Sequence, residues 1–137
     1  MRRMSFQLTL EQMRARQKWV TRRSGWKDLK VGEVLLAVDR TMGLQRGQKA
    51  EVLGEIRVVS VRREPLGALL SAGTYGIEEM VLEGFPGRLP ADFVAWLIGR
   101  TPSLTPETVI TRIQFEHLVD ARVPSLPATW PFPVVGH

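Results

Sequence analysis

The chain has 137 residues, is 44% hydrophobic and carries a formal net charge of +5, which suits one folded domain. It has no cysteine, which excludes disulfides, thiolate metal ligands and a cysteine nucleophile. The two histidines, His117 and His137, make a histidine-rich metal site improbable, and we expect no cofactor. No apolar run reaches the roughly 18 residues that cross a bilayer, and no signal peptide is recognisable. We therefore expect a cytoplasmic protein without membrane contact.

The charge is concentrated in the first half of the chain. Residues 1–63 hold 15 Lys and Arg against 6 Asp and Glu, a balance of +9. Residues 64–137 hold 4 against 8, a balance of −4. This asymmetry suggests RNA or DNA as a partner, although a solvated basic surface would have the same composition. The sequence does not indicate an oligomeric state.

The first elements are a short strand and a helix. Residues 5–8 alternate polar and apolar side chains and predict a half-buried strand. Thr9 and Gln12 form a capping-box pattern, which predicts a helix over about residues 10–17. Its exposed face would carry Arg14 and Arg16.

Several later segments have the composition of strands and are separated by turn residues. They are residues 19–22, 34–38, 52–62 and 109–115. The polar residues 40–49 between two of them, with Gly43 and Gly47, predict a loop. Pro65 is expected to end the long strand that begins at residue 52.

The middle of the chain predicts a short helical turn at 66–70 and helices over 76–83 and 90–99. In the first helix we expect Ile77, Met80 and Val81 on one buried face, with Gly84 as the C-cap. Pro90 suits the first turn of the second helix. Its apolar face would carry Phe93, Trp96 and Leu97.

Prolines at 124, 127, 131 and 133 interrupt the end of the chain. We expect a domain over residues 1–118 and a Pro-rich tail, residues 119–137, packed on that domain or extending from it. The order of elements predicts an α+β fold with a small mixed or barrel-like sheet.

Lys18 and Thr21 lie three residues apart at the junction between the first helix and a strand. There the two side chains can converge on one cleft. Lys18 could hold a phosphate, or act as a base if burial lowers its pKa. A threonine hydroxyl beside a base is a potential nucleophile. The alternative is a solvated lysine followed by a β-forming threonine.

The sequence resembles the ASCH family over roughly residues 5–117. The resemblance rests on Lys18-x-x-Thr21-x-Arg23 and on Leu29-Lys30-Val31-Gly32-Glu33 before an apolar strand. It includes Glu83-Gly84-Phe85 at a helix end, then Phe93 and a closing strand at 109–115. The inserted basic loop, the 90–99 helix and the Pro-rich tail distinguish this chain from small members of the family.

The resemblance implies a small PUA-like β-barrel with flanking helices. Some small ASCH members are amidohydrolases that deacylate N4-acetylcytidine, with a catalytic set that matches Lys18, Thr21 and Glu83 here. Other members bind nucleic acid or are ribonucleases.

Glu83 also has a distinctive position by itself. A carboxylate at a helix C-terminus opposes the helix dipole, so this unfavourable placement indicates a role. Its neighbours Glu78 and Glu79 leave open a solvated acidic helix face.

Basic and aromatic residues around the motif are candidates for contact with nucleic acid. The set is Arg14, Arg16, Arg22, Arg23, Trp26, Arg62 and Arg112. Arg112 could also hold a pocket carboxylate or face outward from its strand, and Trp19 suits core packing as well as base stacking.

The first functional hypothesis is therefore a module that binds nucleic acid or a modified nucleoside in a basic cleft. The alternative is an amidohydrolase that acts on N4-acylcytidine-type substrates. A ribonuclease is the weaker alternative.

Overall fold

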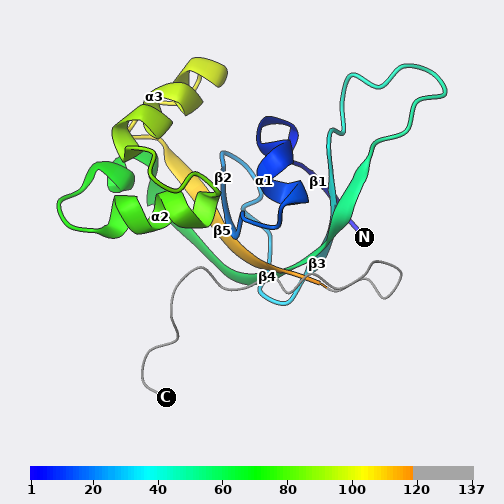
Figure 1. Ribbon diagram of the computed structural model, residues 1–137, viewed down its shortest axis with the longest axis horizontal. Coiled ribbons are helices and arrows are strands. Elements are labelled where there is room, and N and C mark those ends of the chain that lie inside the picture. The colour runs from blue at the N-terminus through cyan, green and yellow to red at the C-terminus, as the bar shows by residue number, and fades with distance from the viewer. Residues whose placement is uncertain (119–137) are drawn as a thin grey trace.

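Five strands form one mixed sheet in the order β1-β3-β4-β5-β2 (Figure 1). The computed structural model describes residues 1–118. The strands are β1 (Arg3–Ser5), β2 (Val20–Arg23), β3 (Val34–Val38), β4 (Val52–Pro65) and β5 (Val109–His117). The helices are η1 (Gln7–Thr9), α1 (Leu10–Arg14), η2 (Leu66–Leu70), α2 (Tyr75–Glu83) and α3 (Pro90–Arg100). These elements confirm the predicted α+β class.

The sheet has two free edges, β1 and β2. Strand β1 runs parallel to β3, and the other neighbouring strands are antiparallel. Within residues 1–118 no strand pairing joins β1 to β2, so the barrel closure expected from the resemblance is not detected. In Figure 1, α1 lies between these two edges, on the concave side of a curved sheet.

Strand β4 is the long central strand and pairs with both neighbours. Its first residues pair with β3, and residues 56–65 pair with β5. The register shifts between Val58 and Ser60, as at a β-bulge, which increases the local bend and twist of a strand. The predicted strand at 52–62 is thus confirmed and continues to Pro65.

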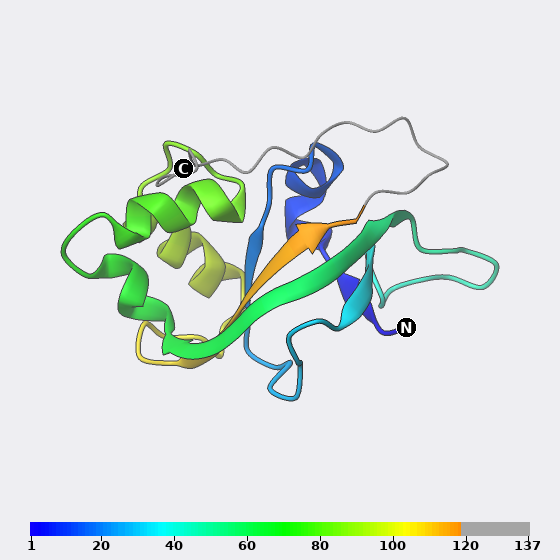
Figure 2. The same ribbon diagram turned by 90° about the horizontal axis from the view of Figure 1, so that it is seen from below.

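Helices α2 and α3 and the 3-10 turn η2 lie together at one end of the sheet (Figures 1 and 2). Their core contains Leu66, Leu69, Met80 and Phe93. A second core, around Met4, Phe6, Met13, Ile56 and Phe115, lies between the sheet and α1. The space between these two packed regions is where the candidate site forms.

The predicted strand at 5–8 is wrong beyond Ser5. Strand β1 pairs with β3 in a register that places Ser5 opposite Val38, the last residue of β3. After Phe6 donates its N–H to the Val38 carbonyl, the chain has no further strand to follow. It turns into η1, and Leu8 is left 47% exposed.

The first helix is shorter than predicted, because it ends at Arg14 rather than residue 17. Arg16 adopts a left-handed conformation with φ 55°. The Gln17 N–H then bonds to the Gln12 carbonyl, and the Arg16 N–H bonds to the Met13 carbonyl. This is a Schellman ending without its usual glycine. Thr9 is the N-cap, but its side chain makes no capping hydrogen bond, so the predicted capping box is wrong.

The buried face of α2 also differs from the prediction. Ile77 is 62% exposed, whereas Met80, Glu79 and Glu83 are buried. The helix turns acidic side chains inward because basic residues of the sheet lie beneath it. The predicted C-cap is confirmed, since Gly84 has φ 94°.

The Pro-rich tail, residues 119–137, lies outside the described residues. Within residues 1–118 no helix is long and apolar enough to cross a membrane.

Candidate functional site

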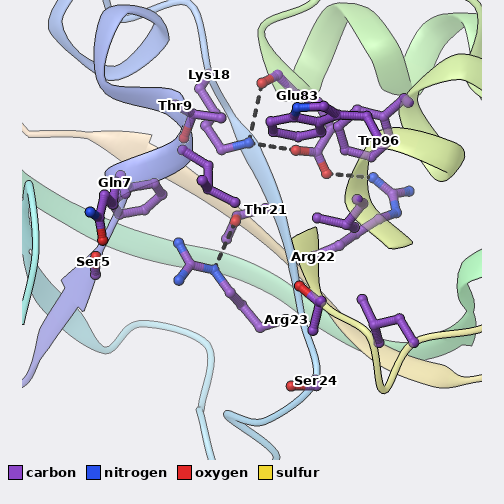
Figure 3. Close-up of a pocket in the computed structure, with 16 residues that line it drawn as sticks. Ser5, Gln7, Thr9, Lys18, Thr21, Arg22, Arg23, Ser24, Glu83 and Trp96 are labelled. Carbon is purple, nitrogen blue, oxygen red and sulfur yellow. Dashed lines mark hydrogen bonds and ion pairs between the residues drawn. The ribbon is translucent and has the colours of Figure 1, made fainter. Parts of the chain in front are cut away.

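A cavity of about 300 Å³ opens between the two free edges of the sheet (Figure 3). One wall comes from the β1–η1 segment, a second from β2, and a third from the end of α2 together with α3 and the turn after it. The lining residues are Ser5, Phe6, Gln7, Leu8, Thr9, Lys18, Thr21, Arg22, Arg23, Ser24, Glu83, Phe93, Trp96, Leu97, Thr101 and Leu104. The cavity thus contains Lys18, Thr21 and Glu83.

Lys18 and Glu83 form a buried ion pair, with 2.5 Å between Lys18 Nζ and Glu83 Oε1. Lys18 Nζ also donates to the Glu83 backbone carbonyl at 3.2 Å. Each residue is only 2% exposed, so water does not screen the pair. The two side chains are 65 positions apart in the sequence, and they meet because α2 ends beside the start of β2.

Backbone contacts fix this meeting point. The Trp19 N–H donates to the Leu82 carbonyl at 2.6 Å, which ties the entry to β2 to the last turn of α2. Gly84 follows Glu83, and a Cβ at this position would lie 2.7 Å from Gln12 Cγ. The early end of α1 and the glycine after α2 therefore allow the two segments to approach closely.

The ammonium of Lys18 loses its proton more readily than that of a solvated lysine. Burial lowers the pKa of Lys18, because the charged form loses hydration, and the charge of Glu83 opposes this shift only in part. An ammonium has three donors, of which two are directed at Glu83. No other residue in the described part of the chain accepts from Lys18 Nζ, so its third donor is available to another group.

Thr21 lies in the same cavity but makes no hydrogen bond to Lys18 within the described part of the chain. Its Oγ1 accepts a hydrogen bond from Arg23 Nε at 3.0 Å. Thr21 and Arg23 are on one face of β2, since they are two residues apart in a strand. Because Oγ1 acts as the acceptor, the hydroxyl proton of Thr21 can be given to a base or a ligand.

Arg62, Arg112 and Arg22 form a row across the three strands β4, β5 and β2. Arg62 pairs with Arg112 in the β4–β5 register, and Arg112 pairs with Arg22 in the β5–β2 register. Such like-charged neighbours are unfavourable without counter-charges. Glu79 of α2 supplies one, since its Oε1 lies 2.5 Å from Arg22 Nη2 and 2.6 Å from Arg112 Nε.

Glu83 is the second carboxylate of this network. Its Oε2 accepts from Arg22 Nη1 at 2.9 Å, while its Oε1 accepts from Lys18. Both oxygens of Glu83 are therefore engaged by cations, which fixes the orientation of the carboxylate (Figure 3). Arg22 positions Glu83, and Glu83 in turn positions Lys18.

The residues predicted to contact nucleic acid are not brought together on one surface. Arg22 and Arg112 are buried, at 7% and 3% exposure, and bind carboxylates. Arg62 is exposed but pairs with Glu64 at 2.8 Å. Arg112 holds a carboxylate, as one alternative expected, but that of Glu79, which does not line the cavity.

The other members of that set lie elsewhere. Arg14 is exposed and paired with Glu11 and Glu51, and Arg16 occupies the turn after α1. Trp26 packs against the core and carries the guanidinium of Arg2 over its ring at 5.0 Å. Among the seven residues, Arg22 and Arg23 line the cavity.

Several lining residues were not predicted as functional. Trp96 and Phe93 of α3 were expected on one apolar face, and the structure places both in the cavity wall. Thr9 and Gln7 reach the cavity because the chain turns after β1. Only the packing of distant segments could reveal these contacts.

His117 fixes the backbone of the site at Lys18. Its Nε2 lies 2.7 Å from the Lys18 carbonyl oxygen, so this nitrogen carries the proton and donates. The ring packs edge-on against Trp19, with 5.1 Å between ring centroids. Burial lowers the pKa of His117, which favours the neutral ring. Trp19 is 6% exposed and belongs to the core, as one of its two predicted roles required.

Comparison with known proteins gives little further guidance. No family model matches the sequence, and no curated protein matches it. Among solved structures, the fold is similar to the crystal structure of protein EF3133 from Enterococcus faecalis V583, described under the family model DUF984. The likeness has a TM-score of 0.47 at 16% sequence identity, and it covers 74% of this chain and 61% of that one.

Proposed function

We propose that the chain is a PUA-like protein of the ASCH type that hydrolyses the amide of an N4-acylcytidine-type nucleoside. One observation carries this proposal. The buried Lys18–Glu83 ion pair lines the same small cavity as the Thr21 hydroxyl. A cavity of about 300 Å³ suits a small ligand, at the lower end of the range for such pockets.

Lys18 is the general base in this proposal. Perturbed lysines in clefts are candidates for proton transfer, because burial brings their pKa nearer to neutrality. Glu83 and Arg22 hold the amine in place, and the free position on Nζ receives the proton of Thr21.

Thr21 is the nucleophile. Its Oγ1 attacks the acyl carbon and its proton passes to neutral Lys18. Collapse of the intermediate breaks the bond between carbon and nitrogen, and the departing amine takes the proton from the Lys18 ammonium. A water molecule then hydrolyses the threonine ester, which releases the acid and restores Thr21. The Arg23 N–H donated to Oγ1 stabilises negative charge that develops there.

The apolar wall offers a place for the base. Trp96 and Phe93 line the cavity, and their ring centroids lie 5.8 Å apart. Aromatic side chains stack on nucleobases without strong dependence on sequence. A cytosine ring against this wall would present its N4 substituent to the polar side of the cavity.

A panel of substrates tests the proposal. N4-acetylcytidine, unmodified cytidine and short single-stranded RNAs are incubated with wild type, Lys18→Met and the exposed control Lys30→Met. We expect release of acetate from N4-acetylcytidine by wild type and by Lys30→Met, and loss of turnover in Lys18→Met. Binding without any turnover would favour a nucleoside-binding module, and cleavage of the RNA would favour the ribonuclease reading.

Contact with nucleic acid is a second candidate, supported by one feature. The polar segment between β3 and β4 extends far from the body of the protein (Figure 2). It carries Arg46 and Lys49, both exposed and without a carboxylate partner in the described part of the chain. Such a basic arm suits attachment to phosphates rather than reading of bases.

A further inference from the structure

Arg23 differs from the other cations of the cavity because no carboxylate among residues 1–118 pairs with it. Lys18 is paired with Glu83, and Arg22 with Glu79, Glu83 and Glu64. Arg23 donates one hydrogen bond, from Nε to the Thr21 hydroxyl, and its guanidinium lies 4.8 Å from the centre of the Phe6 ring. Within residues 1–118 its terminal nitrogens Nη1 and Nη2 donate to no other residue.

The lining of the cavity has an excess of positive charge. Its charged residues are Lys18, Arg22 and Arg23 against Glu83, a balance of +3 − 1 = +2. Behind the lining, Glu79 binds both Arg22 and Arg112, and Glu64 lies 3.5 Å from Arg22, whereas Arg23 has no carboxylate partner within residues 1–118. Burial without a paired carboxylate lowers the pKa of Arg23 to about 10, which still leaves it charged at neutral pH.

The free end of Arg23 faces the cavity rather than the ion-pair network. Figure 3 shows its terminal nitrogens directed away from Lys18 and Glu83, toward the segment that carries Ser5 and Gln7. Ser5 and Gln7 also line the cavity. The two terminal nitrogens of a guanidinium form a fork that matches a carboxylate or a phosphate.

We infer that Arg23 forms an anion subsite, and that the ligand of this cavity carries a carboxylate or phosphate group bound by Nη1 and Nη2. The inference rests on the proposed function and names the charge class of its substrate. The anionic group belongs either to the acyl arm or to the sugar phosphate of the nucleoside. Both sources offer the same two oxygens to the guanidinium fork.

Matched neutral and anionic substrates test the inference. For the acyl arm, N4-succinylcytidine is compared with its neutral primary amide, and for the sugar, N4-acetylcytidine 5′-monophosphate is compared with N4-acetylcytidine. We expect wild type to prefer the anionic member in one of these pairs by roughly 10- to 100-fold in kcat/KM, the range for a hydrogen bond to a charged group. The substrate pair that shows the preference identifies the source of the anion.

Variants locate the preference. Arg23→Met also removes the hydrogen bond to Thr21 and should slow both members of a pair, but it should lower kcat/KM for the anionic member more and so abolish the preference. Lys30→Met, which removes an exposed charge outside the cavity, should keep it. Equal rates for both members of both pairs in wild type overturn the inference, and this comparison does not depend on folding of a variant. A preference that persists in folded Arg23→Met also overturns it.

Binding separates this inference from the proposed hydrolysis. Dissociation constants of cytidine 5′-monophosphate, cytidine and the four substrates are measured by calorimetry in parallel. If no substrate is cleaved but an anionic ligand binds more tightly and requires Arg23, the hydrolase proposal fails and the anion subsite stands. If neutral substrates are cleaved without any anionic preference, the hydrolase proposal stands and the subsite fails.

Discussion

Lys18 is the residue on which the proposed chemistry depends most. It is buried against one carboxylate, Glu83, whose second oxygen is already bound by Arg22. Burial lowers the pKa of Lys18 despite that carboxylate. A lysine with a lowered pKa has a larger neutral fraction near physiological pH than one in solution, and only the neutral amine can accept the Thr21 proton.

The lowered pKa of Lys18 predicts a pH-dependent rate of hydrolysis. The kcat/KM for N4-acetylcytidine should rise with pH through the lowered pKa of Lys18 and level off before the ordinary value of about 10.5. Lys18→Met should remove this rise and lower the rate by roughly 10²- to 10⁴-fold, the usual contribution of a general base. A wild-type profile that keeps rising through pH 10.5 would contradict a depressed lysine.

The same residue predicts a pH-dependent stability. The folded pKa of Lys18 lies below its unfolded value, so between these two pKa values the unfolded chain binds more protons than the folded one. The free energy of unfolding should therefore increase as pH rises through this window, and the gain is absent below it. Denaturant titrations of wild type and Lys18→Met would measure it, and equal pH slopes in the two proteins would count against the shift.

At the scale of elements, α2 is held in place by buried ion pairs as well as by its buried apolar residues Met80 and Leu82. Glu79 bridges Arg22 and Arg112, and Ile77, which the periodicity placed on the buried face, is exposed. Burial opposes ionisation of Glu79, but the hydrogen bond from Arg112 and the charge of Arg22 lower its pKa. The ion pairs therefore fix the position of α2 and, through it, that of Glu83.

Removing one partner of the buried Glu79–Arg112 ion pair should destabilise the fold. Glu79→Gln leaves Arg112 buried without a full counter-charge and should lower the free energy of unfolding by about 3–5 kcal/mol. The double variant Glu79→Gln/Arg112→Met should lose less than the sum of the two single variants, because no unpaired charge remains. Chemical denaturation of the four proteins gives the coupling, and additive losses would show that the pair does not act as a unit.

Gly84 and Gly87 form a matched pair for testing how closely α2 approaches the start of β2. Both have positive φ, 94° and 82°, but a Cβ at Gly84 would meet Gln12 whereas at Gly87 it would meet nothing within 4 Å. Gly87→Ala should cost about 1–2 kcal/mol from backbone strain alone. Gly84→Ala should cost more and also reduce turnover, since it displaces Glu83 from Lys18. Equal effects on stability and activity would contradict the close approach.

At the scale of the whole molecule, internal carboxylates neutralise much of the basic first half. Lys18, Arg2, Arg14 and Arg22 all have acidic partners. A high net charge is therefore weak evidence for a nucleic-acid surface here. Of the exposed basic residues without a carboxylate partner in the described part of the chain, Arg46 and Lys49, on the segment between β3 and β4, are the two that we propose for such contact.

Salt dependence separates these two kinds of cation. If single-stranded RNA binds at low salt, Arg46→Gln/Lys49→Gln should reduce the slope of log affinity against log salt by up to about 1.4, since each phosphate contact contributes about 0.7. Arg2→Gln/Arg14→Gln removes the same charge from ion-paired positions and should change the slope less. A larger effect of the second pair would move the contact surface to the N-terminal face.

Much of the fold could be predicted because its signals are local. The strand at 34–38, the turn at 66–70, the glycine after α2 and the proline opening α3 all follow from neighbouring residues. The ends of β1 and α1 could not be predicted from neighbouring residues. The end of β1 depends on where β3 stops, and the end of α1 depends on the left-handed conformation of Arg16.

The candidate site also contains residues that the sequence predicts and residues that it does not. The Lys-x-x-Thr motif, the helix end at Glu83 and the resemblance to the ASCH family together single out Lys18, Thr21 and Glu83, and the structure brings them to one cavity. The inward turn of Glu79, the row of Arg62, Arg112 and Arg22, and the aromatic wall were not foreseen. They depend on strand register and on packing between distant segments, and a single sequence does not encode either in a local pattern.

We propose that Thr21 is the nucleophile of an amide hydrolase in this cavity. The most direct measurement is the initial rate of acetate release from N4-acetylcytidine by wild type, Thr21→Ser and Thr21→Val. We predict measurable release by wild type, a retained but altered rate in Thr21→Ser, and a loss of at least about 10³-fold in the isosteric, folded Thr21→Val. Thr21→Val that releases acetate at the wild-type rate would contradict the assignment, as would a wild-type protein that releases none.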